Sequence, residues 1–419
     1  MSDRVILHCD CNSFFASVET ALNPAYKNVP MAVCGSESDR HGIVLAKNEL
    51  AKKYGIKTAE TVYSARKKCP GLVIASPHYE EYTKYSRRVN EIYARYTDMI
   101  EPFGIDESWL DVTASKKLFG DGIEIAERIR KEVREEIGIT ISVGVSFNKV
   151  FAKLGSDYKK PDATTVILRE DVERIVYPLP VSDLLFVGQK TADQLKIMGI
   201  KTIGDLSRIP REVLVARFGK YGDQLYKNAN GLDDSPVIRI GEGEDQKSIG
   251  LGFTFRHDLT SREECKIAIN YLSDEVAVRL RNAGMVCNTV QLSIKDEFLS
   301  VIQRQRALAH PTDLAHDISD VANKILIKEW SESRPIRMLT VTAQNLTRKE
   351  YSADQIDIFA EADDTRREKD KKQEHAVDKI RQKFGRESIT NGAILTTDIG
   401  IKDKRIKTNP GRKNNNDDQ

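Results

Sequence analysis

The sequence predicts an α+β protein made of several domains. Its 419 residues have the length of about three domains, and 40% apolar with 31% charged residues is a soluble composition. Short apolar strands alternate with helical segments over the first 165 residues, and a later region has the order strand, helix, strand, strand, helix, strand.

Charge, hydropathy and cysteine content exclude several classes of protein. The net charge of +2 argues against a polycationic tail but leaves a nucleic-acid enzyme open, because such enzymes need only a local basic track. We find no run of about 18 apolar residues, and the N-terminus is too polar for a signal peptide, so we expect no membrane and a cytoplasmic protein. Six scattered cysteines fit neither a disulfide framework nor a zinc spacing, so we expect reduced thiols.

The periodicity of apolar residues predicts the strands and helices of the first 165 residues. A hairpin is expected where residues 100–103 and 109–111 flank Gly104-Ile105-Asp106-Glu107. The other strands are expected at residues 5–8, 31–34, 43–46 and 140–146, and the helices at 13–21, 48–54, 61–68, 78–99, 123–137 and 148–159.

The pattern of prolines and the composition of the chain change after this region. Prolines at 178, 180 and 210 bracket a small helical unit, and a linker begins near residue 233. The chain is mostly charged from residue 350, with a helix expected at 374–384. Residues 404–419 hold too little apolar content to order by themselves.

Three acidic residues stand at places suited to chemistry. Asp10 directly follows a buried strand, and Asp106 and Glu107 lie in the hairpin between apolar neighbours. Each also has an ordinary interpretation, as a helix cap or as a solvated turn residue. Half-buried carboxylates need a cation, and oxygen ligands without histidine or cysteine suit Mg²⁺ or Mn²⁺ better than zinc.

Three segments carry a more specific pattern, namely residues 8–19 (HCDCNSFFASVE), 104–112 (GIDESWLDV) and 142–154 (SVGVSFNKVFAKL). They resemble the core motifs of Y-family DNA polymerases, in the order and spacing of that family. With the later segments, the resemblance covers residues 4–349. It implies a right-hand polymerase with a palm built on a ferredoxin-like sheet (1–10 and 76–165), small fingers (11–75), a helical thumb with a helix-hairpin-helix (166–233), a linker (234–241), an α/β little finger (242–349) and a charged tail (350–419).

The resemblance also implies a two-metal site for nucleotidyl transfer. Asp10, Asp106 and Glu107 would be the catalytic acids and would bind two Mg²⁺ ions, with Mn²⁺ as a substitute. Asp10 and Asp106 would be shared ligands, Glu107 would complete the catalytic-metal site, and the backbone carbonyl of Cys11 would add one oxygen. Such a pair of ions activates the primer 3′-hydroxyl and neutralises the triphosphate.

Residues for sugar and nucleotide selection follow from the same resemblance. Phe15 matches the family's steric gate against a 2′-hydroxyl, although consecutive helical positions point about 100° apart and either Phe14 or Phe15 could instead be core. Lys160 matches the lysine that binds the triphosphate, with a solvated helix end as its ordinary interpretation. Lys52 stands where the family usually has arginine, and it acts as a point charge rather than a fork.

The resemblance extends to contacts with DNA. Residues 185–192 and 198–206 resemble the thumb's helix-hairpin-helix, whose turn would aim N–H groups at a phosphate, with Phe186 in place of the usual first glycine. Simple helix packing is the alternative. In the little finger a polar sheet face could lie along the duplex, and a solvated face is the alternative. The cations expected along the path of the phosphates are Lys149, Lys153, Lys160, Lys295, Arg304 and Arg306.

The segment QIDIF at residues 355–359 resembles the peptide by which bacterial polymerases bind the sliding clamp, through Gln355, Ile358 and Phe359. We therefore expect a monomeric DNA-directed DNA polymerase of low fidelity that performs translesion synthesis, with primer-template DNA, dNTPs and a sliding clamp as partners. The first alternative is a non-catalytic DNA- and clamp-binding accessory factor of the same fold. The second is a nucleotide cyclase on a similar palm.

Overall fold

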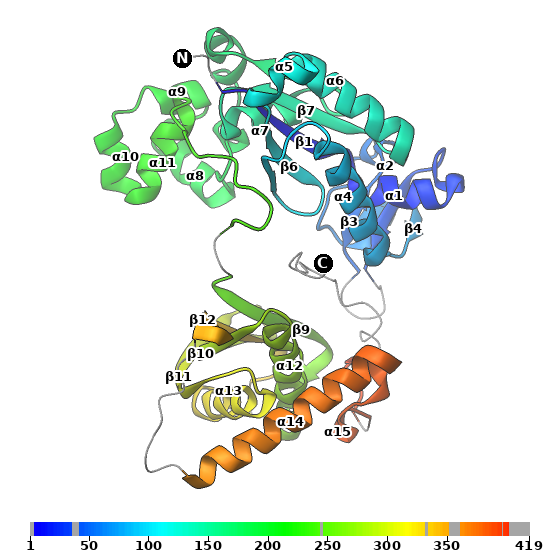
Figure 1. The fold of residues 1–419 in the computed structure, drawn as a ribbon, viewed down its shortest axis with the longest axis vertical. Helices are drawn as coiled ribbons and strands as arrows, with labels where there is room; N and C mark the ends of the chain where they lie inside the picture. The colour runs from blue at the N-terminus through cyan, green and yellow to red at the C-terminus, as the bar shows by residue number, and fades with distance from the viewer. Residues whose placement is uncertain are drawn as a thin grey trace. The chain divides into compact units, whose positions relative to one another are not determined.

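The structure is a computed structural model that describes residues 4–35, 42–243, 246–331, 334–351, 361–395 and 397–401. The chain divides into two compact units, residues 1–35 with 43–243 and residues 36–42 with 244–419. Both units mix helices with β-sheets, which confirms the expected α+β class (Figure 1). Among the described residues, no helix is both long and apolar enough to cross a membrane.

A five-stranded sheet with the order β5-β6-β1-β7-β8 forms the centre of the first unit. β1 pairs antiparallel with both β6 and β7, so the N-terminal strand lies in the middle of the sheet. β5 and β6 form the predicted hairpin. The strands are β1 (Ile6–Cys11), β5 (Ile100–Pro102), β6 (Glu107–Asp111), β7 (Ile141–Ser146) and β8 (Thr164–Ile167).

Side chains of β1 alternate between two environments, as they must in a strand. Its odd-numbered residues belong to the core formed with α4 (Tyr79–Tyr93) and α6 (Gly122–Glu132). Its even-numbered residues face α7 (Lys149–Tyr158), which contacts the side chains of His8 and Asp10. Polar residues of β1 are therefore gathered under α7, on the face opposite the main core.

Two local features fix α7 on the sheet. It lies close against β7 because Gly144 leaves room, and a Cβ there would collide with the Ala152 carbonyl. Asn148 caps the helix by accepting a hydrogen bond from the N–H of Phe151 at 2.8 Å. These two features fix the position of α7, and hence of its side chains, relative to the ends of the strands.

A second sheet and a helical group complete the first unit. The second sheet has the order β3-β2-β4, with β2 (Met31–Cys34), β3 (Val44–Lys47) and β4 (Val73–Ala75). The helices of this region are α1 (Phe14–Leu22), α2 (Glu49–Lys52) and α3 (Val62–Lys68). The remaining α-helices are α5 (Lys116–Phe119), α8 (Gln189–Ile197), α9 (Ile203–Ser207), α10 (Arg211–Phe218) and α11 (Lys220–Ala229).

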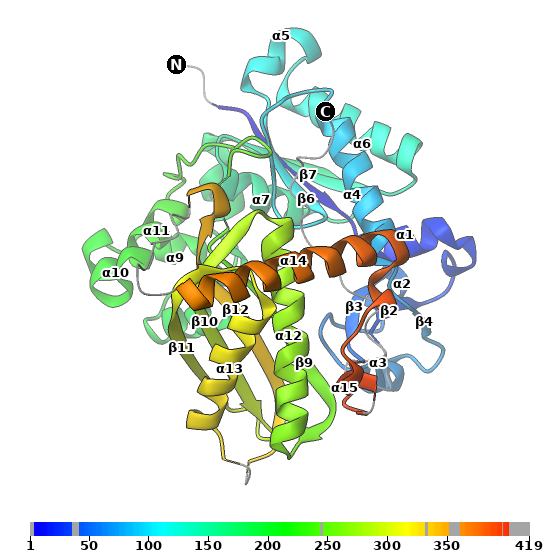
Figure 2. The same cartoon turned by 60° about the horizontal axis from the view of Figure 1, so that its bottom comes forward.

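The second unit contains a four-stranded antiparallel sheet with the order β11-β10-β12-β9. Its elements confirm the predicted order, and they are β9 (Ser248–Leu259), α12 (Arg262–Asn282), β10 (Met285–Asp296), β11 (Val301–Thr312), α13 (Ala315–Glu329) and β12 (Ile336–Arg348). α14 (Glu361–Phe384) crosses α12 and α13 (Figure 2), and α15 (Gly392–Leu395) follows it. Ile394, Ile399 and Ile401 join the core of this unit.

Three helices differ in extent from the expectation. The helix expected at 78–99 ends at Tyr93, and the one expected at 123–137 closes with a π-helical turn at Val133–Ile137. The helix expected at 374–384 begins at Glu361, because its first turns are charged residues with good helix propensity rather than apolar ones. The clamp-like residues Gln355, Ile358 and Phe359 and the segment 404–419 lie outside the described residues.

Candidate active site

The three predicted acids converge at one end of neighbouring strands. The β-sheet register places Asp10 of β1 directly opposite Glu107 of β6. Asp106 directly precedes β6, and its carbonyl oxygen accepts a hydrogen bond from the N–H of Cys11 at 2.9 Å. Asp10 is buried, whereas Asp106 and Glu107 are half-buried. The structure thus brings Asp10, Cys11, Asp106 and Glu107 together.

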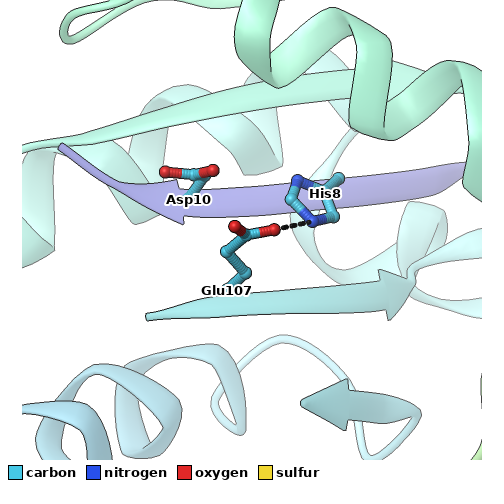
Figure 3. Close-up of side chains that lie close together, drawn as sticks. All are labelled: His8, Asp10 and Glu107. Carbon is cyan, nitrogen blue, oxygen red and sulfur yellow. Dashed lines mark ion pairs between the residues drawn. The ribbon is translucent and has the colours of Figure 1, made fainter. Parts of the chain in front are cut away.

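A histidine that the sequence reasoning missed lies beside these acids. His8 is fully buried, and its Nε2 lies 3.2 Å from Glu107 Oε2, as Figure 3 shows. Its Nδ1 lies 2.8 Å from Ser156 Oγ on α7. One ligand atom each from His8, Asp10 and Glu107 lie within 4.8 Å of one another. The signal was available, because residues two apart in a strand share a face.

Two lysines contact the acids, Lys153 from the middle of α7 and Lys160 from the turn after the helix. Lys153 Nζ lies 3.0 Å from Asp10 Oδ2 and 2.7 Å from Glu107 Oε2. Lys160 Nζ lies 2.6 Å from Asp10 Oδ2 and 2.7 Å from Asp157 Oδ1. Lys160 was expected near a triphosphate, and the structure places it against the acidic cluster.

Asp106 differs from the other two acids in its partners. Burial first, and then the carboxylates of Asp10 and Glu107, raise the pKa of Asp106 to about 6. Within the described part of the chain, no lysine, arginine or histidine lies at ion-pair distance from the Asp106 carboxylate. A hard divalent cation would offset both the burial and the repulsion, so this donor set fits such an ion.

The charges on Glu107 and the lysines are stabilised by contact. Burial alone would raise the pKa of Glu107, but contacts with His8 and Lys153 outweigh it and hold this pKa well below the usual range. Burial would lower the pKa of Lys153 and Lys160, but the carboxylates of Asp10 and Asp157 contribute to raising both. Glu107, Lys153 and Lys160 therefore keep their charges at neutral pH.

Burial distinguishes the two adjacent phenylalanines of α1. Phe14 is 3% exposed and belongs to the core under β1. Phe15 is half-buried, and its ring stacks on Tyr82 with 4.1 Å between the ring centroids and 11° between the planes. Of the two rings, Phe15 is the one that a ligand can reach.

Lys52 and Lys149 are both engaged in ion pairs. Lys52 Nζ lies 2.5 Å from Glu49 Oε1, and the same carboxylate oxygen accepts a hydrogen bond from Ser13 Oγ at 3.2 Å. The pair therefore lies beside the turn that follows β1. Lys149, expected on the path of the phosphates, is buried instead and lies 2.7 Å from Glu101 Oε1.

Comparison with known proteins identifies the family. Three family models match: the impB/mucB/samB family at residues 9–157, its C-terminal domain at 246–358, and the thumb domain of DNA polymerase-iota at 182–233. A protein named DNA polymerase IV from Acetivibrio thermocellus is 47% identical over 95% of this chain and 99% of its own length. The chain belongs to the Y family of DNA polymerases.

Further Y-family relatives cover nearly all of the chain. DNA polymerase IV of Moorella thermoacetica is 39% identical over 96% of this chain and 98% of its own length. DNA polymerase IV 1 of Bacillus subtilis is 34% identical over 94% of this chain and 93% of its own length. A solved Y-family DNA polymerase chimera matches with a TM-score of 0.72 and 25% identity, over 81% of this chain and 98% of the chimera.

The thumb hairpin of this Y-family member keeps its turn without the usual glycine. Phe186 has a φ of 70°, a left-handed conformation that costs a non-glycine residue about 1 to 2 kcal/mol. Tyr221 Oη donates a hydrogen bond to the Phe186 carbonyl at 2.8 Å, and the Phe186 side chain is 61% exposed. The turn at Phe186 thus takes a left-handed conformation at a cost in strain.

The little-finger sheet corrects one expectation for this Y-family member. Lys295 lies on the polar face of β10, but the register pairs Arg304 with Leu292 and Arg306 with Val290, which face the core. Arg304 Nε accordingly lies 3.1 Å from Glu329 Oε2 on α13. Arg304 and Arg306 were expected along the path of the phosphates together with Lys295, but they do not lie on its face of the sheet, because the sequence of β11 alone does not show its register with β10.

Proposed function

We propose that this Y-family member is a DNA-directed DNA polymerase that adds dNTPs to a primer 3′-hydroxyl with low fidelity, and that it performs translesion synthesis. The observation that carries the proposal is the convergence of Asp10, Asp106 and Glu107 at one end of β1 and β6. Nucleotidyl transfer requires alignment and charge compensation at this kind of site. We also expect a cytoplasmic monomer.

Each residue of the cluster has a defined task in this proposal. Asp10, Asp106, Glu107 and the Cys11 carbonyl would hold two Mg²⁺ ions, or Mn²⁺, which supply charge neutralisation and a lower pKa for the primer hydroxyl. Lys153 contacts both Asp10 and Glu107, so it would hold the two carboxylates in a fixed orientation. His8 orients Glu107 from the interior side.

Binding of the incoming dNTP would use residues around this cluster. The Lys160 ammonium, beside Asp10, would meet the triphosphate. If Glu49 and Lys52 lie beside the triphosphate, the ammonium of Lys52 would offset the repulsion between the Glu49 carboxylate and the phosphates. The ring of Phe15, half-buried and stacked on Tyr82, would exclude a 2′-hydroxyl by contact.

Primer extension tests this function. Wild type and Asp106→Ala are compared with Mg²⁺ on an undamaged and an abasic template. The proposal predicts extension on both templates by the wild type and none by the variant. Extension that survives Asp106→Ala would overturn the site, and a folded wild type that binds DNA without extending it would favour the accessory-factor alternative.

Binding to a sliding clamp is proposed from the sequence of residues 355–359. Gln355, Ile358 and Phe359 would be its anchors. Deletion of residues 355–359 is expected to leave synthesis without the clamp unchanged and to abolish stimulation by the clamp. Equal stimulation of the deleted and intact proteins would refute this role.

A further inference from the structure

A buried carboxylate outside the metal cluster has no role in the chemistry described above. Glu19 lies on α1, four residues after Phe15, and only 3% of its surface is exposed. Burying a carboxylate is costly unless donors surround it. Its donors should therefore show what it does.

The donors to Glu19 come from the start of α4. Tyr82 Oη donates to Glu19 Oε1 at 2.5 Å, and the N–H of His78 donates to the same oxygen at 3.3 Å. His78 Nδ1 lies 2.9 Å from Oε1 and 3.0 Å from Oε2. The carboxylate thus bridges α1 to the N-terminus of α4, where the helix dipole also favours an anion.

Tyr82 connects this carboxylate to Phe15. Its side chain is fully buried, and its ring lies nearly parallel to that of Phe15, with 4.1 Å between the centroids. Burial and the Glu19 carboxylate raise the pKa of Tyr82, so its hydroxyl remains a donor. One end of the tyrosine is fixed by Glu19, and the flat face of the same ring supports Phe15.

We propose that Glu19 is a positioning residue for sugar selection, acting through the Tyr82 hydroxyl on the tilt of the Phe15 ring. The inference rests on the proposed function of Phe15 as the steric gate. A steric gate discriminates by shape, so a small change of tilt alters the contact with a 2′-hydroxyl while leaving the metal cluster intact. Rotating a side chain by about 30° away from its preferred rotamer costs a free energy that corresponds to a two- to tenfold change in an equilibrium or a rate. We take this as the expected size of the effect on sugar discrimination.

The test compares kcat/KM for a dNTP and the matching rNTP in full-length variants. Tyr82→Phe removes the hydroxyl and keeps the ring, Glu19→Ala removes the acceptor, and Glu19→Gln keeps a carbonyl oxygen for Tyr82. We expect discrimination to fall about two- to tenfold in Tyr82→Phe and Glu19→Ala and to be restored in Glu19→Gln.

Tyr96→Phe is the matched control. Tyr96 Oη also donates to a glutamate, Glu132 Oε1, at 2.5 Å, and the tyrosine is 6% exposed. Its ring contacts Phe119 rather than Phe15. This variant should lose stability comparable to Tyr82→Phe and keep the wild-type sugar discrimination, so a stability loss alone is separated from positioning.

Phe15→Ala distinguishes failure of this inference from failure of the gate itself. If Phe15→Ala abolishes discrimination while Tyr82→Phe and Glu19→Ala leave it unchanged, Glu19 is not a positioning residue and the gate stands. If Phe15→Ala leaves discrimination unchanged, the gate and the inference are both overturned. In the Phe15→Ala background, Tyr82→Phe should have no further effect on the ratio, and a persistent effect would contradict action through Phe15.

Discussion

Asp106 in the first unit and Glu374 in the second are half-buried carboxylates with contrasting partners. Burial is the first cause of a raised pKa in both, to about 6 for Asp106 and about 7 for Glu374. Glu374 pairs with Arg281 and accepts a hydrogen bond from the N–H of Ala315 at 2.9 Å. Within the described ranges no cation lies at ion-pair distance from Asp106, and the charge of Lys160 only partly offsets its raised pKa. Burial alone therefore does not distinguish a carboxylate of a functional site from one that stabilises the fold, whereas the partners of the carboxylate do.

The partners of Glu374 serve the fold of the second unit. Ala315 begins α13, whose own N-cap residue, Leu314, makes no side-chain cap, so Glu374 of α14 supplies the missing acceptor. Arg281 of α12 also binds both carboxylate oxygens of Asp378, at 2.6 and 3.1 Å. These contacts attach α14 to α12 and α13. In the acidic cluster of the first unit, by contrast, Lys153 and Lys160 pair with Asp10 and Glu107, and no cation of the described residues pairs with Asp106.

The largest expected effect is on catalysis. Asp106→Asn should lower the rate of nucleotide addition at least about a thousandfold, because it removes a ligand for ions that supply several kcal/mol of charge stabilisation. Glu374→Gln should extend primers at close to the wild-type rate. Single-turnover incorporation measures both. Comparable losses in the two variants would erase the distinction between the two carboxylates.

The next effect is on stability. Arg281→Met should destabilise the second unit by about 3 kcal/mol, the lower end for a broken buried pair, because Asp378 and Glu374 would remain half-buried without their cation. Urea unfolding measures this change. The control is Lys131→Met, which breaks an exposed pair with Glu135 at 4.0 Å and should cost at most about 1 kcal/mol. An Arg281→Met protein as stable as the control would contradict a structural role for this cluster.

A smaller effect is the pH dependence of Asp106. Its pKa is raised in the folded state, so the folded protein binds the proton more tightly and this contribution favours folding as pH falls from about 6 to about 4. Without divalent metal, Asp106→Asn should be more stable than wild type by about 2 to 3 kcal/mol at pH 7.5, and this difference should nearly vanish by pH 4. Unfolding curves in EDTA at the two pH values measure it. If the difference in stability between wild type and Asp106→Asn does not depend on pH, the pKa of Asp106 is not raised in the folded state.

Local patterns predicted the strands and helices, whereas the three acids were selected by the resemblance of their motifs to those of Y-family polymerases. The strand expected at 5–8 extends to Cys11 and the one expected at 109–111 begins at Glu107, so Asp10 and Glu107 lie within β1 and β6, where the register brings them together. Contacts between distant segments gave no local signal. The choice between Phe14 and Phe15 depends on Tyr82, a residue of another helix, and the error for Arg304 arose from an unknown register with β10.

Binding of Mn²⁺, followed by electron paramagnetic resonance with Mg²⁺ as competitor, tests the central claim most directly. The claim is that Asp106, as a half-buried acid with no cation at ion-pair distance among the described residues, marks a divalent-metal site. Wild type and Glu374→Gln should bind Mn²⁺ with similar affinity and release it to Mg²⁺, whereas Asp106→Asn should bind at least about tenfold more weakly. Binding by Asp106→Asn as tight as that of the wild type would contradict the claim.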